Sequence, residues 1–423
     1  MSLRDDSWKA RPHYARWLGS TNNITQQFLA IGGIPDIISL AGGLPAAELY
    51  PVEEIRQASD RALTRWGTQA LEYGPVEGFP ALRQAIAERM SEATGGAFTA
   101  DNVLITSGAA QGLDLVGKLF LDRGDLAIVQ HPTYLGALDA WRPREPHYEK
   151  LTWNLDDPDF ESRLKAAKFV YAVPNYSNPT GVLVPEDARQ RLLGQVAGAG
   201  TLLVEDDPYL PLQLDGKAGR SLLSMAASRK AYDGPVIYLG TLSKSIVPGL
   251  RVGWVIAPAD LVQALALAKQ SSDLSSSMLT HVIALALLES GFETGHVQKT
   301  VAAYRERRDA LMEAAALHLS EWFDWDTPPG GMFAWLSAKS HSGRALIDTD
   351  RLYHYALAQK VAFVPSSVFD FEGKLNSAMR LNFTRSSPEA IGEGIARLRL
   401  AVERYLAEAN ERPPERTASW DNR

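Results

Sequence analysis

The sequence predicts an α/β fold, in which a large domain with a mostly parallel central sheet joins a smaller α+β domain built from the N- and C-terminal parts. Between roughly residues 100 and 260, short β-rich runs alternate with helical runs. This is the pattern of a parallel sheet covered by helices on both faces. Strand-like and helical runs resume after Pro328-Pro329-Gly330-Gly331. The length of 423 residues is sufficient for two domains.

The spacing of apolar residues predicts the individual elements. In the large domain we expect helices at 53–66 and 80–93 and strands at 102–106, 126–130, 169–173, 201–205, 236–239 and 252–257. A short strand precedes them near 37–40, and helical spacing covers 259–318, with one long amphipathic helix at 296–318. In the smaller domain we expect strands at 332–336 and 379–383 and helices at 350–360 and 388–408.

These runs divide the chain into three parts. Residues 1–54 form an N-terminal arm and part of the small domain, 55–298 form the large domain, and 299–423 form the small C-terminal domain. The polar tail from about residue 412 is expected to be disordered.

Composition narrows the classes of function. The formal net charge is −7 with no strongly basic segment, so we expect no nucleic-acid partner. No run reaches the roughly 18 apolar residues of a membrane span, and the N-terminus mixes acidic and basic residues unlike a signal peptide. The absence of cysteine removes disulfides and thiolate chemistry. Because the histidines lack ligand spacing, we expect no metal site either. These features favour a cytoplasmic enzyme.

The stretch 238–254 carries the strongest chemical signal. Lys244 lies in a Ser/Thr-rich turn after an apolar strand, with Thr241 and Ser243 before it and Arg251 seven residues after it. Two hydroxyls and a guanidinium suit a dianionic phosphate. A lysine beside a phosphate site is the arrangement that pyridoxal phosphate (PLP) enzymes use for their Schiff base. A strand-to-loop turn with a solvated lysine would explain the same residues.

Two further polar positions follow predicted strands, where ligands of such sheets bind. Asp206 would keep a pyridine nitrogen protonated by ion pairing, and Tyr209 would donate to the cofactor's phenolate oxygen. Asn178 would donate to the same oxygen and to a substrate carboxylate. An acidic helix cap at Asp206 and ordinary turn chemistry at Asn178 are the alternatives.

The remaining candidates serve the phosphate, the ring and the substrate. Ser107, Gly108, Ala109 and Ala110 precede an apolar helix at 113–120, and the N–H groups of a helix start favour phosphate. Tyr134 would stack on an aromatic ring. Arg380, in an alternating strand, would hold an α-carboxylate with two hydrogen bonds. A capping serine, a packed tyrosine and a surface salt bridge are the respective alternatives.

Taken together, these motifs resemble the fold-type I PLP-dependent aminotransferases of the class I/II family. The opening Ala41-Gly42-Gly43-Leu44-Pro45 is similar to the branch of 2-aminoadipate and kynurenine aminotransferases, which MocR-type regulators share. The resemblance runs from about residue 37 to residue 400. It implies a PLP-dependent transferase fold, with PLP bound by the large domain, and an amino group moved from an L-amino acid to a 2-oxo acid by way of pyridoxamine phosphate.

The resemblance also implies a role for each candidate. The implied catalytic residues are Lys244, Asp206, Tyr209 and Tyr134. The implied cofactor-binding residues are Tyr73, Ser107, Gly108, Ala109, Ala110, Tyr134, Asn178, Asp206, Tyr209, Thr241, Ser243, Lys244 and Arg251. Gly43, Asn178 and Arg380 would bind the substrate, and Tyr73 would reach the phosphate of the partner subunit in a homodimer.

Two departures from the family pattern modify these expectations. Ala109 and Ala110 replace a hydroxyl residue and a glutamine that relatives often carry, which predicts weaker cofactor retention. The segment 20–28 lacks the arginine that relatives use for dicarboxylic substrates. Because an unpaired buried carboxylate is costly, we expect neutral, apolar or aromatic amino donors to be favoured.

Two other functions remain open at this point. The same residues would serve a PLP-dependent lyase or decarboxylase, because the bond held perpendicular to the ring decides which one breaks. A non-catalytic, MocR-like effector domain is the third interpretation. Such regulators carry a DNA-binding domain and a linker upstream, whereas about 35 residues precede the first motif here.

Overall fold

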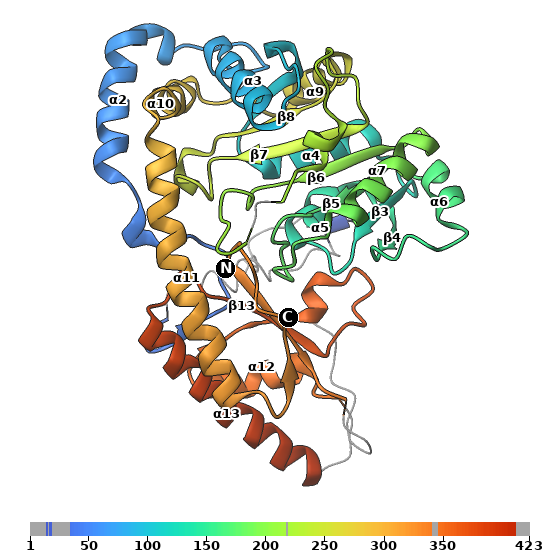
Figure 1. Ribbon diagram of the computed structural model, residues 1–423, viewed down its shortest axis with the longest axis vertical. Coiled ribbons are helices and arrows are strands. Elements are labelled where there is room, and N and C mark those ends of the chain that lie inside the picture. Colours follow the sequence, from blue (N-terminus) through green and yellow to red (C-terminus); the bar gives the residue numbers. More distant parts are fainter. Residues whose placement is uncertain (1–13, 16, 19–33, 217–218, 341–345, 412–423) are drawn as a thin grey trace, which may run out of the picture.

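A seven-stranded sheet forms the centre of the larger part of the molecule (Figure 1). The computed structural model describes residues 14–15, 17–18, 34–216, 219–340 and 346–411. The strand order is β2-β8-β7-β6-β5-β3-β4. The strands are β2 (Val103–Thr106), β3 (Leu126–Gln130), β4 (His147–Leu151), β5 (Phe169–Ala172), β6 (Leu202–Asp206), β7 (Val236–Thr241) and β8 (Gly253–Ile256). All pairs from β7 to β4 are parallel and β8 runs antiparallel to both neighbours, which confirms the predicted fold class.

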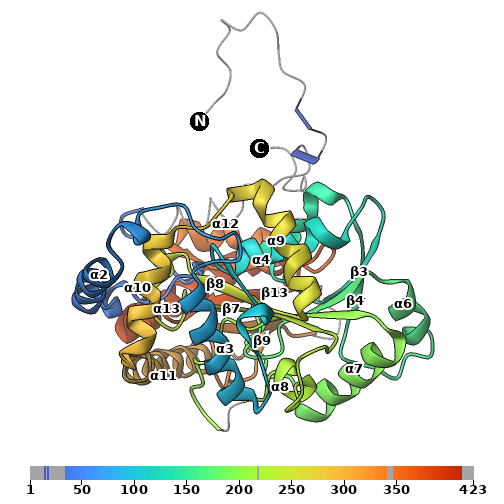
Figure 2. The same cartoon turned by 90° about the horizontal axis from the view of Figure 1, so that it is seen from above.

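Helices cover both faces of this sheet, as the view from above shows (Figure 2). One face packs on α4 (Ala109–Phe120), α5 (Leu135–Trp141) and α9 (Ala259–Asp273). The other is covered by α3 (Pro80–Thr94), α6 (Phe160–Ala166), α7 (Glu186–Ala199), α8 (Leu222–Ala226) and α10 (Met278–Glu289), and α2 (Val52–Trp66) packs on the outside of α10. Side chains alternate between the faces along each strand. In β2, for example, Leu104 joins the first apolar cluster and Ile105 the second.

The smaller part contains a four-stranded antiparallel sheet in the order β12-β13-β10-β9. Its strands are β9 (Phe323–Asp324), β10 (Phe333–Ala338), β12 (Val364–Pro365) and β13 (Ala378–Asn382), and its helices are α12 (Thr349–Ala358) and α13 (Pro388–Glu411). The N-terminal β1 (Ile38–Ser39) pairs in parallel with β11 (Val361–Ala362). The smaller part is therefore built from both ends of the described chain, as predicted.

The long helix α11 (Phe292–His318) connects the two parts (Figure 1). It begins four residues before the predicted start at 296, because Gly291 adopts a left-handed conformation and ends the preceding turn. The proposed domain boundaries at residues 54 and 298 fall inside α2 and α11, and this division remains a proposal. The polar tail from 412 and the segment 20–28 lie outside the described residues.

Two elements differ from the sequence-based expectations. The helix α4 begins at Ala109 rather than at 113, because Gly108, with φ of 81°, turns the chain directly into two alanines that favour helix. The edge strand β4 was not predicted, because His147, Glu149 and Lys150 give it no apolar run.

Short 3-10 helices include Ala47–Leu49, Gly67–Ala70, Ala100–Asn102, Arg142–Arg144, Pro248–Leu250 and Ser366–Phe369.

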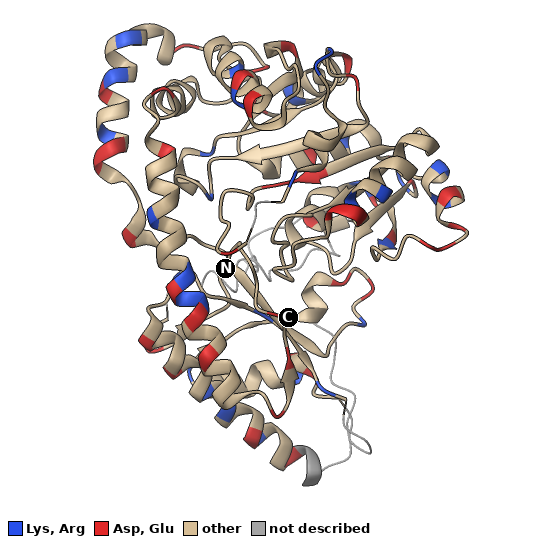
Figure 3. Cartoon of the chain, viewed as in Figure 1, with Lys and Arg blue, Asp and Glu red and all other residues tan. Residues whose placement is uncertain are grey.

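Charges of both signs alternate over the surface helices, for example along α2 and α13 (Figure 3). Ion pairs one helical turn apart, such as Arg397 with Glu393 and Arg399 with Glu403, account for part of this pattern. Within the described residues, no helix combines the length and the apolar character that crossing a membrane requires.

Candidate active site

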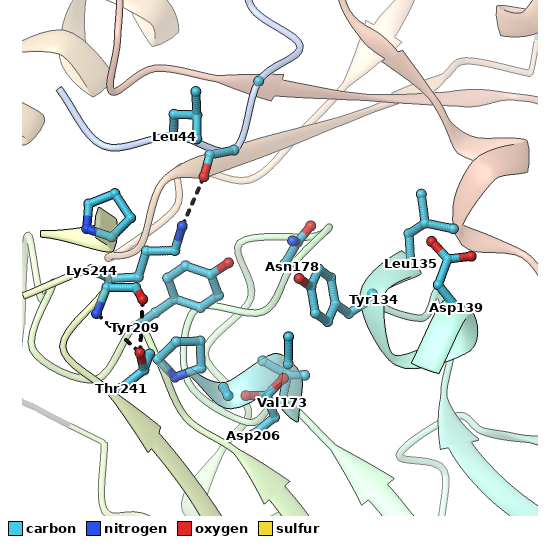
Figure 4. Close-up of a pocket in the computed structure, with 18 of the residues that line it drawn as sticks. Leu44, Tyr134, Leu135, Asp139, Val173, Asn178, Asp206, Tyr209, Thr241 and Lys244 are labelled. Atoms are coloured by element: carbon cyan, nitrogen blue, oxygen red, sulfur yellow. Dashed lines mark hydrogen bonds between the residues drawn. The ribbon is translucent and has the colours of Figure 1, made fainter. Parts of the chain in front are cut away.

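A cavity of about 470 Å³ lies at the carboxyl ends of the central strands, between the two sheets. Asp206 ends β6, Thr241 ends β7, and Asn178 follows β5. Twelve of the predicted site residues line this cavity, several of them in Figure 4: Gly43, Ala109, Ala110, Tyr134, Asn178, Asp206, Tyr209, Thr241, Ser243, Lys244, Arg251 and Arg380. The fold thus brings together residues that span more than three hundred positions of the chain.

Lys244 lies in the turn after β7 and extends into the cavity. Its Nζ donates a hydrogen bond to the carbonyl oxygen of Gly43 at 2.9 Å. Burial lowers the pKa of Lys244 to about 8, and the positive charges of Arg380 and Arg251 act in the same direction against the opposing effect of Asp206. A substantial neutral fraction near neutral pH makes this amine a competent nucleophile and base. The alternative of a solvated lysine in an ordinary turn is wrong.

An anion site surrounds one end of the cavity. The hydroxyl groups of Thr241 and Ser243 lie 3.0 Å apart, and Nη1 of Arg251 lies 3.4 Å from Oγ of Ser243. Arg251 is held in a left-handed conformation with φ of 52°, a costly arrangement found where the surrounding structure imposes it. Three polar groups on one turn therefore converge on the position that a phosphate would occupy.

The start of α4 forms the opposite wall of this anion site. Nη2 of Arg251 donates to the carbonyl oxygen of Ser107 at 3.0 Å. A Cβ at Gly108 would lie only 2.5 Å from that nitrogen, so glycine is needed for the approach. Ala109 and Ala110 line the cavity at the first turn of α4, where helix N–H groups lack intrahelical acceptors and favour anions.

Asp206 is buried beneath the centre of the cavity. Its Oδ2 accepts a hydrogen bond from the hydroxyl of Tyr171 at 2.9 Å. Its Oδ1 is buried and has no hydrogen-bond partner among the described residues. Burial raises the pKa of Asp206 to about 7, against the lowering effect of the bond from Tyr171. An orphaned carboxylate oxygen at this position fits a protonated ring nitrogen, and the helix-cap alternative is wrong.

Arg380 and Asn178 form the other polar end of the cavity, the one without the anion site. Nη1 of Arg380 donates to Oδ1 of Asn178 at 2.8 Å, and Nη2 donates to the carbonyl oxygen of Ala41 at 2.6 Å. The guanidinium lies over the rings of Phe333 and Phe369, at 4.3 and 5.0 Å from their centroids. Arg380 is 7% exposed, and burial lowers its pKa to about 10. A surface salt bridge is therefore excluded, and a bound carboxylate would balance the charge.

Two tyrosines flank the space above Asp206 (Figure 4). A Cβ at Gly136 would lie about 2.5 Å from the ring of Tyr134, so the glycine allows this ring to lie across the start of α5. Tyr209 packs edge-on against Phe333, with ring centroids 5.9 Å apart, and its hydroxyl bonds the Asn178 side chain. Burial raises the pKa of both hydroxyls, so both stay protonated and able to donate near neutral pH.

Three predicted residues lie outside the cavity wall. Ser107 and Gly108 stand behind Arg251, and the N-cap of α4 is Gly108 without a side-chain cap bond, so the capping serine is wrong. The N–H of Ser107 instead donates to Oε1 of Gln111 at 2.8 Å. Tyr73 is 79% exposed on the loop before α3, and its predicted contact with a partner subunit stays a prediction.

Sequence reasoning missed several residues of the site. Tyr171 reaches Asp206 because β5 and β6 pair in parallel with Tyr171 opposite Val204, and no local motif marks that contact. The cavity wall also includes Leu135, Asp139, Val364, Val368 and Phe369. In the part of the chain that the structure covers, no group of three or more His, Asp or Glu residues is arranged to hold a metal ion.

Comparisons with known proteins agree with this geometry. Residues 35–398 match the aminotransferase class I and II family. An aromatic-amino-acid aminotransferase from Thermococcus litoralis is 37% identical over 395 residues, covering 90% of this chain and 91% of the relative. Among solved structures, an alpha-aminoadipate aminotransferase from Thermus thermophilus, complexed with N-(5'-phosphopyridoxyl)-L-leucine, has a TM-score of 0.82 and 35% identity over 93% of this chain and 98% of that one. A kynurenine aminotransferase from Pyrococcus horikoshii in complex with PMP has a TM-score of 0.85 and 33% identity, over 93% and 97%.

The chain therefore belongs to the aminotransferase class I and II family. It is a PLP-dependent aminotransferase, so the resemblance seen in the sequence motifs, the enzyme class and the cofactor are confirmed. The residues present also fit this cofactor. The anion site suits its phosphate, the orphaned oxygen of Asp206 suits its ring nitrogen, and Lys244 carries the amine for its aldehyde.

Proposed function

We propose that this aminotransferase favours neutral, apolar or aromatic L-amino acids as donors and passes the amino group to a 2-oxo acid. The observation that carries the proposal is the apolar part of the cavity lining. Leu44, Leu135, Val364, Val368 and Phe369 contribute apolar side chains to it. Apolar side chains of a donor gain by burial against such a lining.

The charges of the cavity support the same preference. Arg380, Arg251 and Lys244 are the cations of the described lining, and each already has an assigned anion or reacting group. Asp139, on α5, adds a half-buried carboxylate to the wall, where it is ion-paired with Arg142 at 3.1 Å. Among the described lining residues, a second substrate carboxylate would therefore meet no cation without an assigned role. Acidic donors are therefore disfavoured.

The roles of the individual residues follow from their positions. When bound, PLP supplies an aldehyde that takes up the amino group and a ring that withdraws electrons from the substrate α-carbon. Asp206 would hold the proton on the ring nitrogen, and Tyr209 and Asn178 would donate to the ring oxygen. Thr241, Ser243 and Arg251 would hold the phosphate together with the start of α4.

The substrate is oriented from the other end. Arg380 binds the α-carboxylate with its fork of donors, and the amide of Asn178, which already accepts from Arg380, fixes the guanidinium and faces the same carboxylate. Tyr134 covers the ring face and limits the entry of water. Nζ of Lys244 then takes the proton from the substrate α-carbon, since its lowered pKa leaves it partly neutral.

Two further aspects belong to this proposal. Tyr73 is a large, exposed aromatic side chain on the loop before α3, and such residues are enriched in interfaces. We propose that it completes the phosphate site of the partner in a homodimer. The proposed compartment is the cytoplasm, and the proposed partners are small amino and 2-oxo acids.

Relatives support the donor class. The Thermococcus litoralis relative is named for aromatic amino acids, and the Thermus thermophilus structure holds a phosphopyridoxyl derivative of leucine, although that enzyme is named for alpha-aminoadipate. An enzyme of this family thus accommodates an apolar side chain.

The test is a comparison of kcat/KM for phenylalanine, leucine, 2-aminoadipate and glutamate with a fixed 2-oxo acid acceptor. The proposal expects phenylalanine or leucine to exceed both acidic donors by about tenfold or more, since one unpaired charge corresponds to at least about 1.4 kcal/mol. The matched variant Asp139→Asn is expected to narrow that gap. A wild-type enzyme that prefers 2-aminoadipate overturns the proposal.

A further inference from the structure

The segment 366–375 supplies the wall of the cavity beside Arg380 and is tied across to the central sheet. It connects β12 to β13 in the smaller part of the molecule. Val368 and Phe369 at its start line the cavity. The residues that follow, Asp370 to Glu372, contact side chains of β4 and of the loop after β3 in the larger part.

Asp370 makes polar contacts between the segment 366–375 and the larger part of the molecule. Its Oδ1 lies 3.1 Å from Nε2 of His131, directly after β3. The carboxylate also accepts backbone N–H groups of its own loop, from Glu372 at 3.1 Å, Lys374 at 2.8 Å and Leu375 at 2.9 Å. The loop is therefore folded by local bonds, and the bond to His131 adds only the tie between the two sheets.

Phe371 makes the aromatic contacts between the same segment and the larger part. Its ring packs edge-on against His131, with centroids 6.0 Å apart, and lies 5.4 Å from the ring of Tyr148 on β4. Nζ of Lys150 lies 5.7 Å from the same ring and 2.8 Å from Oε2 of Glu372. A backbone bond from Thr133 N–H to the Phe369 carbonyl, at 2.8 Å, runs beside these contacts.

These contacts reach the substrate end of the site from two sides. Phe369 directly precedes Asp370 and packs against the guanidinium of Arg380. Tyr134 follows His131 by three residues and covers the cavity from the larger part. The His131–Asp370 pair and the Thr133–Phe369 backbone bond therefore both join the loop that carries Tyr134 to the loop that carries Phe369, and the pair is the side-chain part of this connection. A change at this pair would alter where the Phe369 ring sits beneath Arg380.

We propose that the His131–Asp370 pair is a positioning device that sets the affinity of the active site for the donor carboxylate and side chain. It holds Phe369 against Arg380 and fixes the width of the cavity between Phe369 and Tyr134. The inference rests on the proposed function, because it assigns the donor to this end of the cavity. Among the described residues, neither His131 nor Asp370 contacts the groups of the phosphate end, so the affinity for PLP is expected to change little when the pair is altered.

The test uses the PLP-loaded protein and 3-phenylpropionate, an unreactive carboxylate with an aromatic side chain, titrated by calorimetry. His131→Phe keeps a ring against Phe371 and removes the donor to Asp370. His131→Gln keeps an amide donor of similar reach. The control is His147→Gln, at an exposed position of β4. The dissociation constant of PLP is measured for every variant by absorbance.

We expect His131→Phe to weaken 3-phenylpropionate about three- to thirtyfold, the range of typical coupling effects. PLP affinity should stay within about twofold, as for distant independent sites, and His131→Gln should recover most of the loss. Unchanged 3-phenylpropionate affinity in His131→Phe overturns the inference while leaving the proposed function in place. A parallel loss of PLP affinity, without recovery in His131→Gln, also overturns it. Wild-type protein that binds neither PLP nor 3-phenylpropionate contradicts the proposed function itself.

Discussion

The two ends of the active-site cavity are built in different ways. At the phosphate end, Thr241, Ser243, Lys244 and Arg251 come from one turn after β7 and are joined by short contacts within it. At the substrate end, Arg380, Asn178 and the carbonyl of Ala41 come from segments hundreds of residues apart. Most of the first end is a local structure, to which the fold adds the start of α4, whereas the second exists only when both sheets are correctly placed. Changes at the two ends should therefore separate cofactor binding from donor binding.

The largest effect is expected at Lys244. Lys244→Ala removes both the amine for the cofactor aldehyde and the base for the substrate α-proton, so transamination should fall by about 10⁴-fold or more. Phosphate contacts remain, so PLP should still bind, without a covalent bond. The half-reaction with phenylalanine, followed by absorbance, measures this. Retention of more than a few per cent of the activity would assign the base to another residue.

Asp206→Asn tests how much the buried carboxylate of Asp206, which serves the cofactor, lowers the free energy of unfolding of the apoprotein. Burial raises the pKa of Asp206 from 3.8 to about 7. Between these two pH values, Asp206 therefore carries a proton in the folded apoprotein but has released it in the unfolded chain. The contribution of Asp206 to the free energy of unfolding therefore falls as pH rises. Asparagine still accepts from Tyr171, so the variant apoprotein should be more stable than wild type near pH 8, by at most about 4 kcal/mol at about 1.4 kcal/mol per pKa unit.

The measurement is urea unfolding of both apoproteins. The stabilisation should be smaller near pH 5 than near pH 8, since part of the raised-pKa effect is absent at the lower pH. If the difference in free energy of unfolding between the variant and wild-type apoproteins is the same at both pH values, a raised pKa at Asp206 is contradicted. This holds whether the variant is the more stable or the less stable of the two.

Arg380→Lys tests the substrate end alone. Lysine keeps the positive charge and loses the fork that bonds Asn178 and a carboxylate together. The KM for phenylalanine should rise about 10²-fold, as for the loss of a buried charged hydrogen-bond pair, with the dissociation constant of PLP unchanged. Steady-state kinetics and absorbance titration measure the two quantities. An equal loss of PLP affinity would show that the two ends are not separate.

The smallest effect is expected at Ala109, where the anion site lacks a side-chain donor. Ala109→Ser adds a hydroxyl at the first turn of α4 and should tighten PLP binding about two- to tenfold, the value of one hydrogen bond. Ala81→Ser in the first turn of α3 is the matched control. Unchanged PLP affinity in Ala109→Ser would mean that backbone N–H groups and Arg251 already satisfy the phosphate.

The difference between the two ends of the cavity also explains which site residues could be predicted from the sequence. Thr241, Ser243, Lys244 and Arg251 are neighbours in sequence, so this part of the phosphate end was visible as a pattern before any fold was known. Arg380 and Asn178 were predicted as single residues, but their mutual bond depends on the distance between two sheets. Tyr171 and Phe369 were missed, because strand register brings one to Asp206 and a loop between β12 and β13 brings the other to Arg380.

Misjudged elements have local causes. The polar edge strand β4 lacks the apolar run that identifies buried strands. The early start of α4 depends on the positive φ of Gly108, a conformation that the sequence permits without requiring it. Pairing with β3 therefore decided β4, whereas the conformation of Gly108 decided the start of α4.

The most direct test of the central claim is an absorbance spectrum of the purified protein with PLP, before and after single amino acids are added without an acceptor. The account predicts a band of lysine-bound cofactor that phenylalanine or leucine converts to the pyridoxamine phosphate form, with one equivalent of 2-oxo acid released. A band that no amino acid discharges, or one that yields pyruvate and ammonia instead, would contradict transamination. Absence of the band, unaffected by Lys244→Ala, would contradict the assignment of the site.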